Sequence, residues 1–129
     1  HGIDQLRDIV APFGYRVVSV EFTGCLHLKS AVTTLATNLL LLNPAWVSAA
    51  AFPDCQSLLV DDREPCAANG LRIADTILYP AQFPRTRERL FERGLHVATV
   101  DCSELAKAEG AVTCCSLVFE AGPGDKSCS

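Results

Sequence analysis

The sequence lacks a strongly basic segment and a long apolar run, and both absences restrict the partners to be expected. Eleven lysine and arginine residues stand against fifteen acidic ones, for a net charge of −4. A nucleic-acid-binding surface would require a basic patch or stripe. The longest apolar run, Leu39 to Leu42, is far shorter than the roughly 20 residues that cross a bilayer. We therefore expect neither a nucleic acid nor a membrane as partner.

Cysteine pairs of the C-x-x-C kind are also missing, which argues against a zinc ribbon. Seven cysteines are present, and an odd number cannot pair completely within one chain. No charged segment followed by an apolar one and a small-residue cleavage site opens the sequence, as a secretory leader would. We therefore expect reduced thiols in a cytoplasmic protein, with no metal and no cofactor.

An initiating methionine is absent as well, because the sequence opens at His1 and runs directly into a helical pattern. Such an opening is expected of a piece of a longer protein, although a native chain remains an alternative. The length of 129 residues suits one modest domain. We assign residues 1–119 to that domain and residues 120–129, rich in Gly and Ser with one Pro, to a flexible tail.

Hydrophobic patterning predicts an α/β chain. The spacing of Ile3, Leu6 and Ile9 ahead of Gly14 predicts a first helix. Alternating or continuous apolar segments predict strands over residues 15–22, 27–35, 39–42, 56–60, 95–100 and 112–119, with a tight hairpin over 71–79. The last of these strands is expected to be buried on both faces. Start and stop residues predict further helices over 43–51, 86–93 and 103–107, the last with Ser103 as its cap.

A helix, a glycine and a strand follow one another twice, over residues 6–21 and 89–101. Each unit precedes a predicted strand that carries a chemically interesting residue, His27 in the first case and Cys114 in the second. Repeated units of this kind favour a pseudo-symmetric assembly. Any α/β chain can reuse the same order of elements, so the repeat alone does not establish that assembly.

Cys114 and His27 are the residues most suited to chemistry. A thiolate nucleophile needs a neighbouring base or cation, and an imidazole supplies either. In a strand, Cys114 and Cys115 would point to opposite faces, so one of them could face a cavity. Each residue taken alone is better explained as a packed side chain, but the two together suggest a cysteine hydrolase. A zinc ion held by the same pair is a second hypothesis, for which no further ligand is evident.

Two charged groups have simpler interpretations. Asp61, Asp62 and Glu64 could hold a cation, although a solvated loop explains them better. The arginines at 85, 87, 89 and 93 could bind phosphate, but the interleaved Glu88 and Glu92 favour a helix face with internal salt bridges. His96 lies in a predicted strand beside Gly94 and has the weaker case for chemistry.

Four ordered motifs resemble the dimethylarginine dimethylaminohydrolases. The first is G-C-L-H-L-K-S at residues 24–30, and the second is C-A-A-N-G at residues 66–70. The third runs from Tyr79-Pro80 through F-P-R-T-R-E at residues 83–88. The fourth begins with S-E-L at residue 103 and continues as E-G-A-V-T-C-C-S-L-V-F at residues 109–119. Each motif is modest alone, and together they are specific.

The resemblance implies a fold and an incomplete molecule. Members of this superfamily, which modifies guanidino groups and includes amidinotransferases, form an α/β propeller of five ββαβ-type units around a substrate channel. A full member is about twice this length, so the chain is similar to a C-terminal half of about two and a half units. The remaining half would carry the acidic residues that grip the guanidinium. An N-terminal half or a second copy is therefore expected as partner.

The resemblance also implies roles for individual residues. Cys114 matches the nucleophile and His27 the general acid/base. Backbone carbonyls near Ala108 and Glu109 match groups that accept the α-amino group of the substrate, although mammalian members carry Asp where this chain has Glu109. The implied reaction hydrolyses Nω-methylated arginine, a small guanidino substrate, to citrulline and a methylamine. Alternatives are a related arginine or agmatine deiminase and a non-catalytic binding or structural half.

Overall fold

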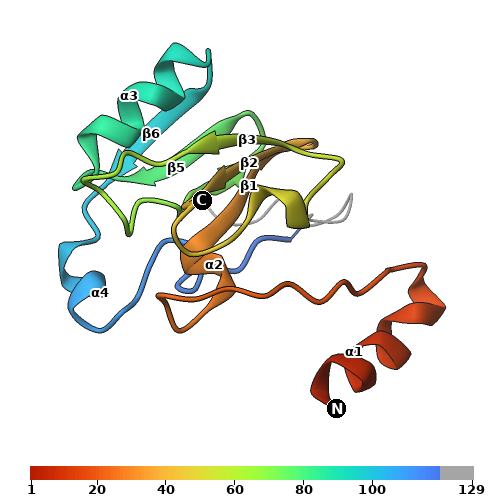
Figure 1. Ribbon diagram of the computed structural model, residues 1–129. Coiled ribbons are helices and arrows are strands. Elements are labelled where there is room, and N and C mark those ends of the chain that lie inside the picture. Colours follow the sequence, from red (N-terminus) through yellow and green to blue (C-terminus); the bar gives the residue numbers. More distant parts are fainter. Residues whose placement is uncertain (120–129) are drawn as a thin grey trace, which may run out of the picture.

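Two three-stranded sheets form the body of the molecule in the computed structural model, which describes residues 1–119 (Figure 1). The first sheet contains β1 (Val32–Ala36), β2 (Leu39–Leu42) and β3 (Gln56–Leu59), and the second contains β4 (Leu71–Ile73), β5 (Thr76–Pro80) and β6 (His96–Val100). In both sheets the first two strands are antiparallel and the third pairs in parallel with the second. The predicted α/β class is confirmed. The tail assigned to 120–129 lies outside the described residues.

The helices are short. They comprise α1 (Gly2–Val10), the 3₁₀ turn η1 (Ala11–Phe13), α2 (Leu28–Ala31), the 3₁₀ turn η2 (Ala49–Ala51), α3 (Pro84–Glu92) and α4 (Ser103–Lys107). As predicted, Gly14 stops the first helical segment, in the left-handed conformation at φ 76°. None of the helices within residues 1–119 combines the length and the apolar character that a membrane span requires.

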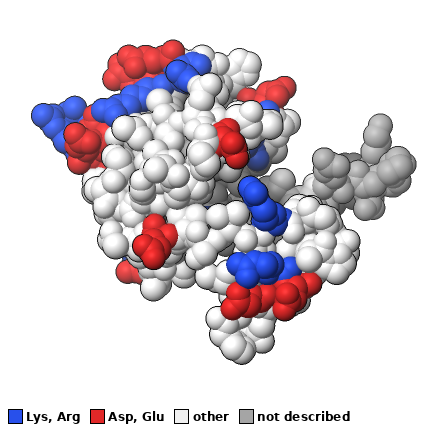
Figure 2. All heavy atoms as spheres, turned by 45° about the vertical axis from the view of Figure 1, so that its right-hand side comes forward, with Lys and Arg blue, Asp and Glu red and all other residues white. Residues whose placement is uncertain are grey.

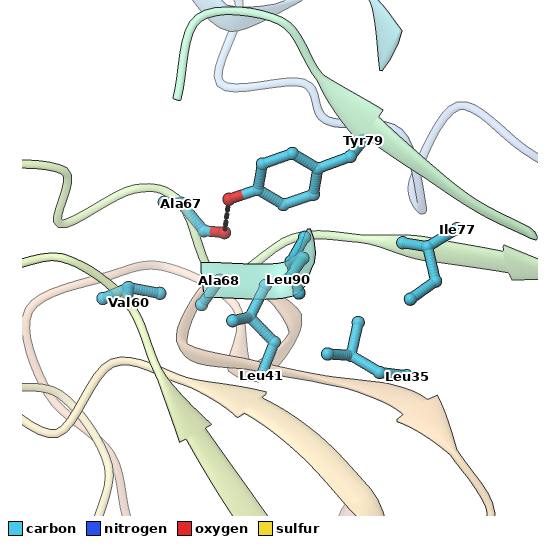
Figure 3. Close-up of a cluster of buried hydrophobic side chains, with 8 residues drawn as sticks. All are labelled: Leu35, Leu41, Val60, Ala67, Ala68, Ile77, Tyr79 and Leu90. Atoms are coloured by element: carbon cyan, nitrogen blue, oxygen red, sulfur yellow. Dashed lines mark hydrogen bonds between the residues drawn. The ribbon is translucent and has the colours of Figure 1, made fainter. Parts of the chain in front are cut away.

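Strand β2 is buried on both faces, which explains its unbroken run of leucines. Leu41 points into a cluster between the two sheets and α3, shown in Figure 3, together with Leu35, Ile77, Tyr79 and Leu90 among others. Leu40 and Leu42 point the opposite way, into a second cluster with Val32 and Val47. Full burial of each leucine is worth about 1.5–3 kcal/mol. The first sheet is therefore covered on one face by the second sheet and α3, and on the other mainly by loops.

The strand predicted over residues 15–22 is wrong. The segment crosses from α1 to the body without joining a sheet (Figure 1), and its β-structure is limited to an isolated bridge between Phe22 and Val47. Tyr15 and Val18 are 72% and 58% exposed. Val20 and Phe22 pack against the second cluster, but the described chain supplies no neighbouring strand, which strand-forming residues need in order to join a sheet.

The strand predicted over residues 27–35 begins later than expected. His27 precedes the single-turn helix α2, in which the Ser30 N–H donates to the His27 carbonyl at 2.9 Å, and the strand starts at Val32. Pairing with β2 ends at Val32 and Leu42, so the residues ahead of Val32 have no strand beside them. His27 therefore lies ahead of the strand and not within it.

The helix predicted over residues 43–51 is replaced by turns and η2. The Asn43 Oδ1 atom accepts a hydrogen bond from the Ala45 N–H at 2.9 Å, and its Nδ2 atom donates to the Pro65 carbonyl at 2.8 Å. The side chain thus forms a local turn and a long-range tie together, which compete with a regular helix. Residues 43–55 form a compact loop that connects β2 to β3.

The strand predicted over residues 112–119 is also wrong. Residues 112–115 form turns closed by local bonds, such as the one from the Cys115 N–H to the Ala111 carbonyl at 3.2 Å. Leu117 and Phe119 are 85% and 74% exposed, not buried. The predicted cap of α4 is displaced too, because Cys102 is the N-cap and Asp101 Oδ1 accepts from the Ser103 N–H at 2.8 Å.

Candidate active site

A cavity of about 690 Å³ lies where five separate segments of the chain meet. Its wall is formed by the chain around the start of α2, the loop between β2 and β3, the 66–69 segment, residues 80–83 from the end of β5 to the start of α3, and residues 102–111 in and around α4. Among the lining residues are His27, Trp46, Cys66, Asn69, Glu109 and Ala111. The cavity therefore collects residues from all four sequence motifs.

His27 has an extended backbone and is the N-cap of α2. Its exposed side chain lines the cavity. The chain ahead of it is fixed by a close packing of Gly24 against Trp46. Gly24 has φ +75°, and a Cβ atom added there would lie 2.3 Å from the Trp46 Cδ1 atom. The Thr23 N–H also donates to the Trp46 carbonyl at 2.8 Å. The glycine is needed both for its left-handed backbone and for the missing side chain.

Cys114 is exposed and lies in the turn after α4. Its Sγ atom accepts a hydrogen bond from the Ala111 N–H at 3.1 Å and lies 3.4 Å from the Ala111 carbonyl oxygen. Ala111 itself lines the cavity, whereas Cys114 does not belong to its lining and is joined to it by these contacts with Ala111. The structure therefore brings His27 and the turn that carries Cys114 to the same cavity. The pairing of their sulfur and imidazole groups stays a prediction.

Glu109 lines the cavity in a left-handed conformation, at φ 56°. It follows Ala108, the C-cap of α4. The Glu109 N–H donates to the Ala106 carbonyl at 3.1 Å and the Gly110 N–H to the Leu105 carbonyl at 2.8 Å, which is a Schellman ending. Glycine is usual at this position, and another residue costs about 1–2 kcal/mol there. Backbone strain of this kind is concentrated at functional sites.

Three cysteines line the cavity, and they differ in burial. Burial raises the pKa of the Cys25 thiol, and burial together with the charge of Asp101 raises that of Cys102. A raised pKa keeps a thiol protonated near neutral pH, so both are poor nucleophiles. Cys66 is exposed, as Cys114 is. The six cysteines of the described chain are all free.

Two further cavity residues are Asn69, which belongs to the second sequence motif but was given no role there, and Trp46, which lies in no motif. Asn69 is 4% exposed and bonds to both Lys29 and Thr113, which flank the two candidate catalytic segments. Its signal in the sequence is an amide placed after the small apolar pair Ala67-Ala68. Trp46 gave no signal, because its role depends on Gly24, 22 residues away in the sequence.

The acidic loop between the two sheets is neither fully solvated nor built around a cation. The Glu64 carboxylate is 8% exposed and accepts from the Arg85 and Thr86 N–H groups at 3.0 and 2.7 Å, which caps α3. Asp61 pairs with Arg89 at 2.8 Å. Within residues 1–119, no three His, Cys, Asp or Glu side chains cluster closely enough to hold a metal ion.

The salt bridges predicted within α3 are wrong. Glu88 and Glu92 form no ion pair with any described residue, and Arg89 reaches across to Asp61 and to the carbonyls of Leu59 and Val60. A carboxylate and two carbonyl oxygens at one site satisfy the guanidinium better than an exposed pair on the same helix. The arginine therefore ties α3 to the end of the first sheet.

Comparison with known proteins confirms the resemblance that the motifs predicted. No protein-family model matches the chain. The chain is 35% identical over 118 residues to the N(G),N(G)-dimethylarginine dimethylaminohydrolase of Pseudomonas aeruginosa, which covers 92% of this chain and 46% of that protein. It is 37% identical over 117 residues to the enzyme of the same name from Streptomyces coelicolor, covering 90% and 44%. The chain thus spans about half the length of these relatives.

A solved structure agrees with the sequence comparison. The dimethylarginine dimethylaminohydrolase of Pseudomonas aeruginosa, a cysteine-to-serine mutant complexed with citrulline, matches with a TM-score of 0.79 and 33% identity. The match covers 87% of this chain and 44% of the other. The α/β fold therefore matches part of that solved structure, as expected for an incomplete propeller.

Proposed function

We propose that this chain supplies the nucleophile and the acid/base group of a hydrolase that converts Nω-methylated arginine to citrulline and a methylamine. One observation carries the proposal: His27 and the turn bearing Cys114 meet at one cavity, in a chain that resembles dimethylarginine dimethylaminohydrolases. Burial raises the pKa of the Cys25 and Cys102 thiols, which disfavours these two as nucleophiles, and Cys114 is exposed. Its position in the fourth motif favours it over the exposed Cys66.

The reaction proceeds in two stages. The Cys114 thiolate adds to the guanidinium carbon, and the C–N bond to the methylated nitrogen breaks as the His27 imidazolium protonates the departing amine. This leaves an S-alkylthiouronium on Cys114. Neutral His27 then removes a proton from water, the water oxygen bonds to the carbon, and the C–S bond breaks to release citrulline. Acid–base assistance of this kind contributes roughly 10²–10⁴ in rate, and positioning and charge stabilisation supply the rest.

The end of α4 is suited to hold the other end of the substrate. The proposed acceptors of the α-amino group are the carbonyls near Ala108 and Glu109. The strained backbone at Glu109, in the wall of the cavity, supports this assignment. Because backbone groups would make the contact, the Glu109 side chain is not required for it.

A complementary half would complete the active site and cover apolar surface. Phe13, Leu117 and Phe119 are 76%, 85% and 74% exposed. Figure 2 shows charged side chains gathered over α3 and over α1, with isolated charged side chains on the surface between them. Large apolar side chains on a surface are a mark of interaction sites. The complement would be an N-terminal half of the same propeller or a second copy, and the free thiols favour a cytoplasmic location.

The test is citrulline release from monomethylarginine and asymmetric dimethylarginine. It should be measured with this chain alone, over a range of concentrations, and with the chain mixed with the remaining half of the Pseudomonas aeruginosa relative. We expect Cys114→Ser to abolish turnover in the active sample while leaving substrate binding intact. Cys66→Ser is the matched control, an exposed thiol at the same cavity, and should keep turnover. Normal turnover by Cys114→Ser would remove Cys114 from the mechanism.

The same assay separates the alternatives. Ammonia release from unmethylated arginine, with no methylamine from the methylated substrates, would identify a deiminase. Stable association with the complementary half without citrulline formation by either sample would identify a non-catalytic partner. Sedimentation measurements on the chain alone and in the mixture report that association directly.

A further inference from the structure

We propose that Asn69 is a positioning residue, which holds the His27 segment and the Cys114 turn in one fixed arrangement. Its Nδ2 atom donates to the Lys29 carbonyl at 3.0 Å and to the Thr113 Oγ1 atom at 2.9 Å. Its Oδ1 atom accepts from the Thr113 N–H at 3.1 Å. Lys29 lies two residues after His27, and Thr113 directly precedes Cys114. The inference rests on the proposed function, because it concerns the pair of residues assigned to catalysis there.

The amide is itself anchored in the core through its neighbours. The Ala67 carbonyl accepts from the Tyr79 hydroxyl at 2.7 Å, and the Ala68 carbonyl accepts from the Thr33 hydroxyl, also at 2.7 Å. The Gly70 N–H donates to the same Thr33 Oγ1 atom at 3.1 Å. Ala67 and Ala68 are fully buried, with no exposed area. The segment is therefore held on three consecutive peptide groups, and Asn69 projects from a rigid base.

The hydrogen-bonding capacity of Asn69 is almost fully used by these contacts. Both N–H groups of the amide and one acceptor position of its oxygen are engaged by protein atoms. Within residues 1–119, Asn69 is the one side chain from outside the 111–116 turn that forms a hydrogen bond with that turn. The turn is otherwise closed by its own local bonds. Asn69 thus provides the polar connection between the two candidate catalytic segments.

Positioning of this kind affects the rate more than it affects substrate binding. A displacement of about 1 Å can cost roughly 10²-fold in rate when two groups must act together. Because the Asn69 amide is satisfied by protein atoms, its loss should lower kcat roughly 10²-fold and change KM little. A residue that only supported the fold would reduce the amount of folded protein without this separation of kcat from KM.

The test uses the rate at which iodoacetamide alkylates Cys114, followed by mass mapping of the peptide that contains it. In a chain that keeps Asn69, the substitution His27→Ala should slow this alkylation about tenfold or more, since the imidazole assists thiolate formation. In an Asn69→Ala background, the same His27→Ala substitution should have almost no further effect. Glu64→Gln is the matched control, because it removes a buried contact at α3 and should leave the His27 effect intact.

A full His27 effect in a folded Asn69→Ala chain would overturn the inference. Should that variant fail to fold, Thr113→Ala gives the second measurement. It removes the bond to Nδ2 and keeps the one to the backbone N–H, so it should reduce the His27 effect only partly, and an unchanged effect would overturn the inference. No His27 effect in the unmodified chain would instead refute the Cys–His pair of the proposed function, a result that is distinct from either.

Discussion

The two sheets share one topology but differ in how the chain crosses from the second strand to the third. Between β5 and β6 the crossover contains α3, which packs Leu90 into the central cluster. Between β2 and β3 it is the loop over residues 43–55, which holds only the turn η2. Both crossovers cover apolar surface, since Val47 and Phe52 of the loop pack on the outer face of the first sheet. The same strand order can therefore be covered by a helix or by a loop.

The loop crossover contributes to the candidate site as well as to the core. It carries Trp46 to Gly24, so that the indole both fixes the chain ahead of His27 and lines the cavity. The helical crossover is tied to the segment that connects the two sheets. Glu64 of that segment accepts hydrogen bonds from the first turn of α3, and Arg89 of α3 pairs with Asp61. Both crossovers contribute to the cavity wall, since Gln82 and Phe83 directly precede α3. The loop also fixes the chain ahead of His27, whereas α3 holds the body together.

The largest effect should come from Gly24→Ala, which tests the loop crossover. The new Cβ atom would lie 2.3 Å from the indole, in a left-handed backbone. We expect a loss of about 2–4 kcal/mol in unfolding free energy, from overpacking and backbone strain together. The measurement is urea unfolding followed by circular dichroism.

Gly94→Ala is the control that sharpens this comparison. Gly94 ends the helical crossover at φ +77°, with nothing within 4 Å of the added Cβ atom. Only the backbone strain applies, so the loss should be about 1–2 kcal/mol. Equal losses in the two variants would show that the contact with Trp46 does not constrain the loop.

An intermediate effect is expected from Glu64→Gln, which tests the helical crossover. The amide keeps one acceptor oxygen, but its NH₂ group would face a backbone N–H that now has a carboxylate oxygen as partner. We expect a loss of about 1–3 kcal/mol in the same unfolding measurement. The exposed Glu88, on α3 itself, supplies the control Glu88→Gln, which should change stability by less than about 0.5 kcal/mol. An equally large loss in Glu88→Gln would show that the effect comes from removing a negative charge near α3, and not from the two hydrogen bonds of Glu64.

The smallest effect concerns acid and the joint between the units. The Arg63 N–H, and secondarily the Arg89 charge, hold the pKa of Asp61 below its usual range. A lowered folded-state pKa contributes stability that is complete above the ordinary Asp value of about 3.9. That contribution is lost as the pH falls through the lower, folded value. Asp61→Asn should therefore flatten the acid limb of the stability curve, whereas Asp62→Asn should leave it nearly as it is.

Local pattern predicted those elements that find their partners within the chain. The hairpin over 71–79, the helix that ends at Gly94 and the strand β6 all correspond to the structure. The segments over 15–22 and 112–119 have the composition of strands, yet no strand pairs with them here. Composition reports a tendency to join a sheet, and the sheet itself has to be supplied by other residues.

The sequence motifs singled out His27 and Cys114, and the structure places His27 in the wall of the cavity and Cys114 in a turn beside Ala111, which also lines it. Their catalytic roles stay predictions. Asn69 joins Lys29 and Thr113, which are 40 and 44 positions away from it in the sequence. Such a connection depends on the assembled core, not on any local pattern. The left-handed Glu109 could not be foreseen either, because glycine is the residue that predicts such a helix ending.

Trp46 is the single tryptophan of the chain, and it faces the space where a substrate would enter. Its fluorescence therefore reports from one known place, without any added label. Filling the cavity would displace water from around the indole and alter the emission spectrum. The ring that packs on Gly24 thus gives the molecule its own optical sensor of occupancy, usable even with a variant in which catalysis has been abolished.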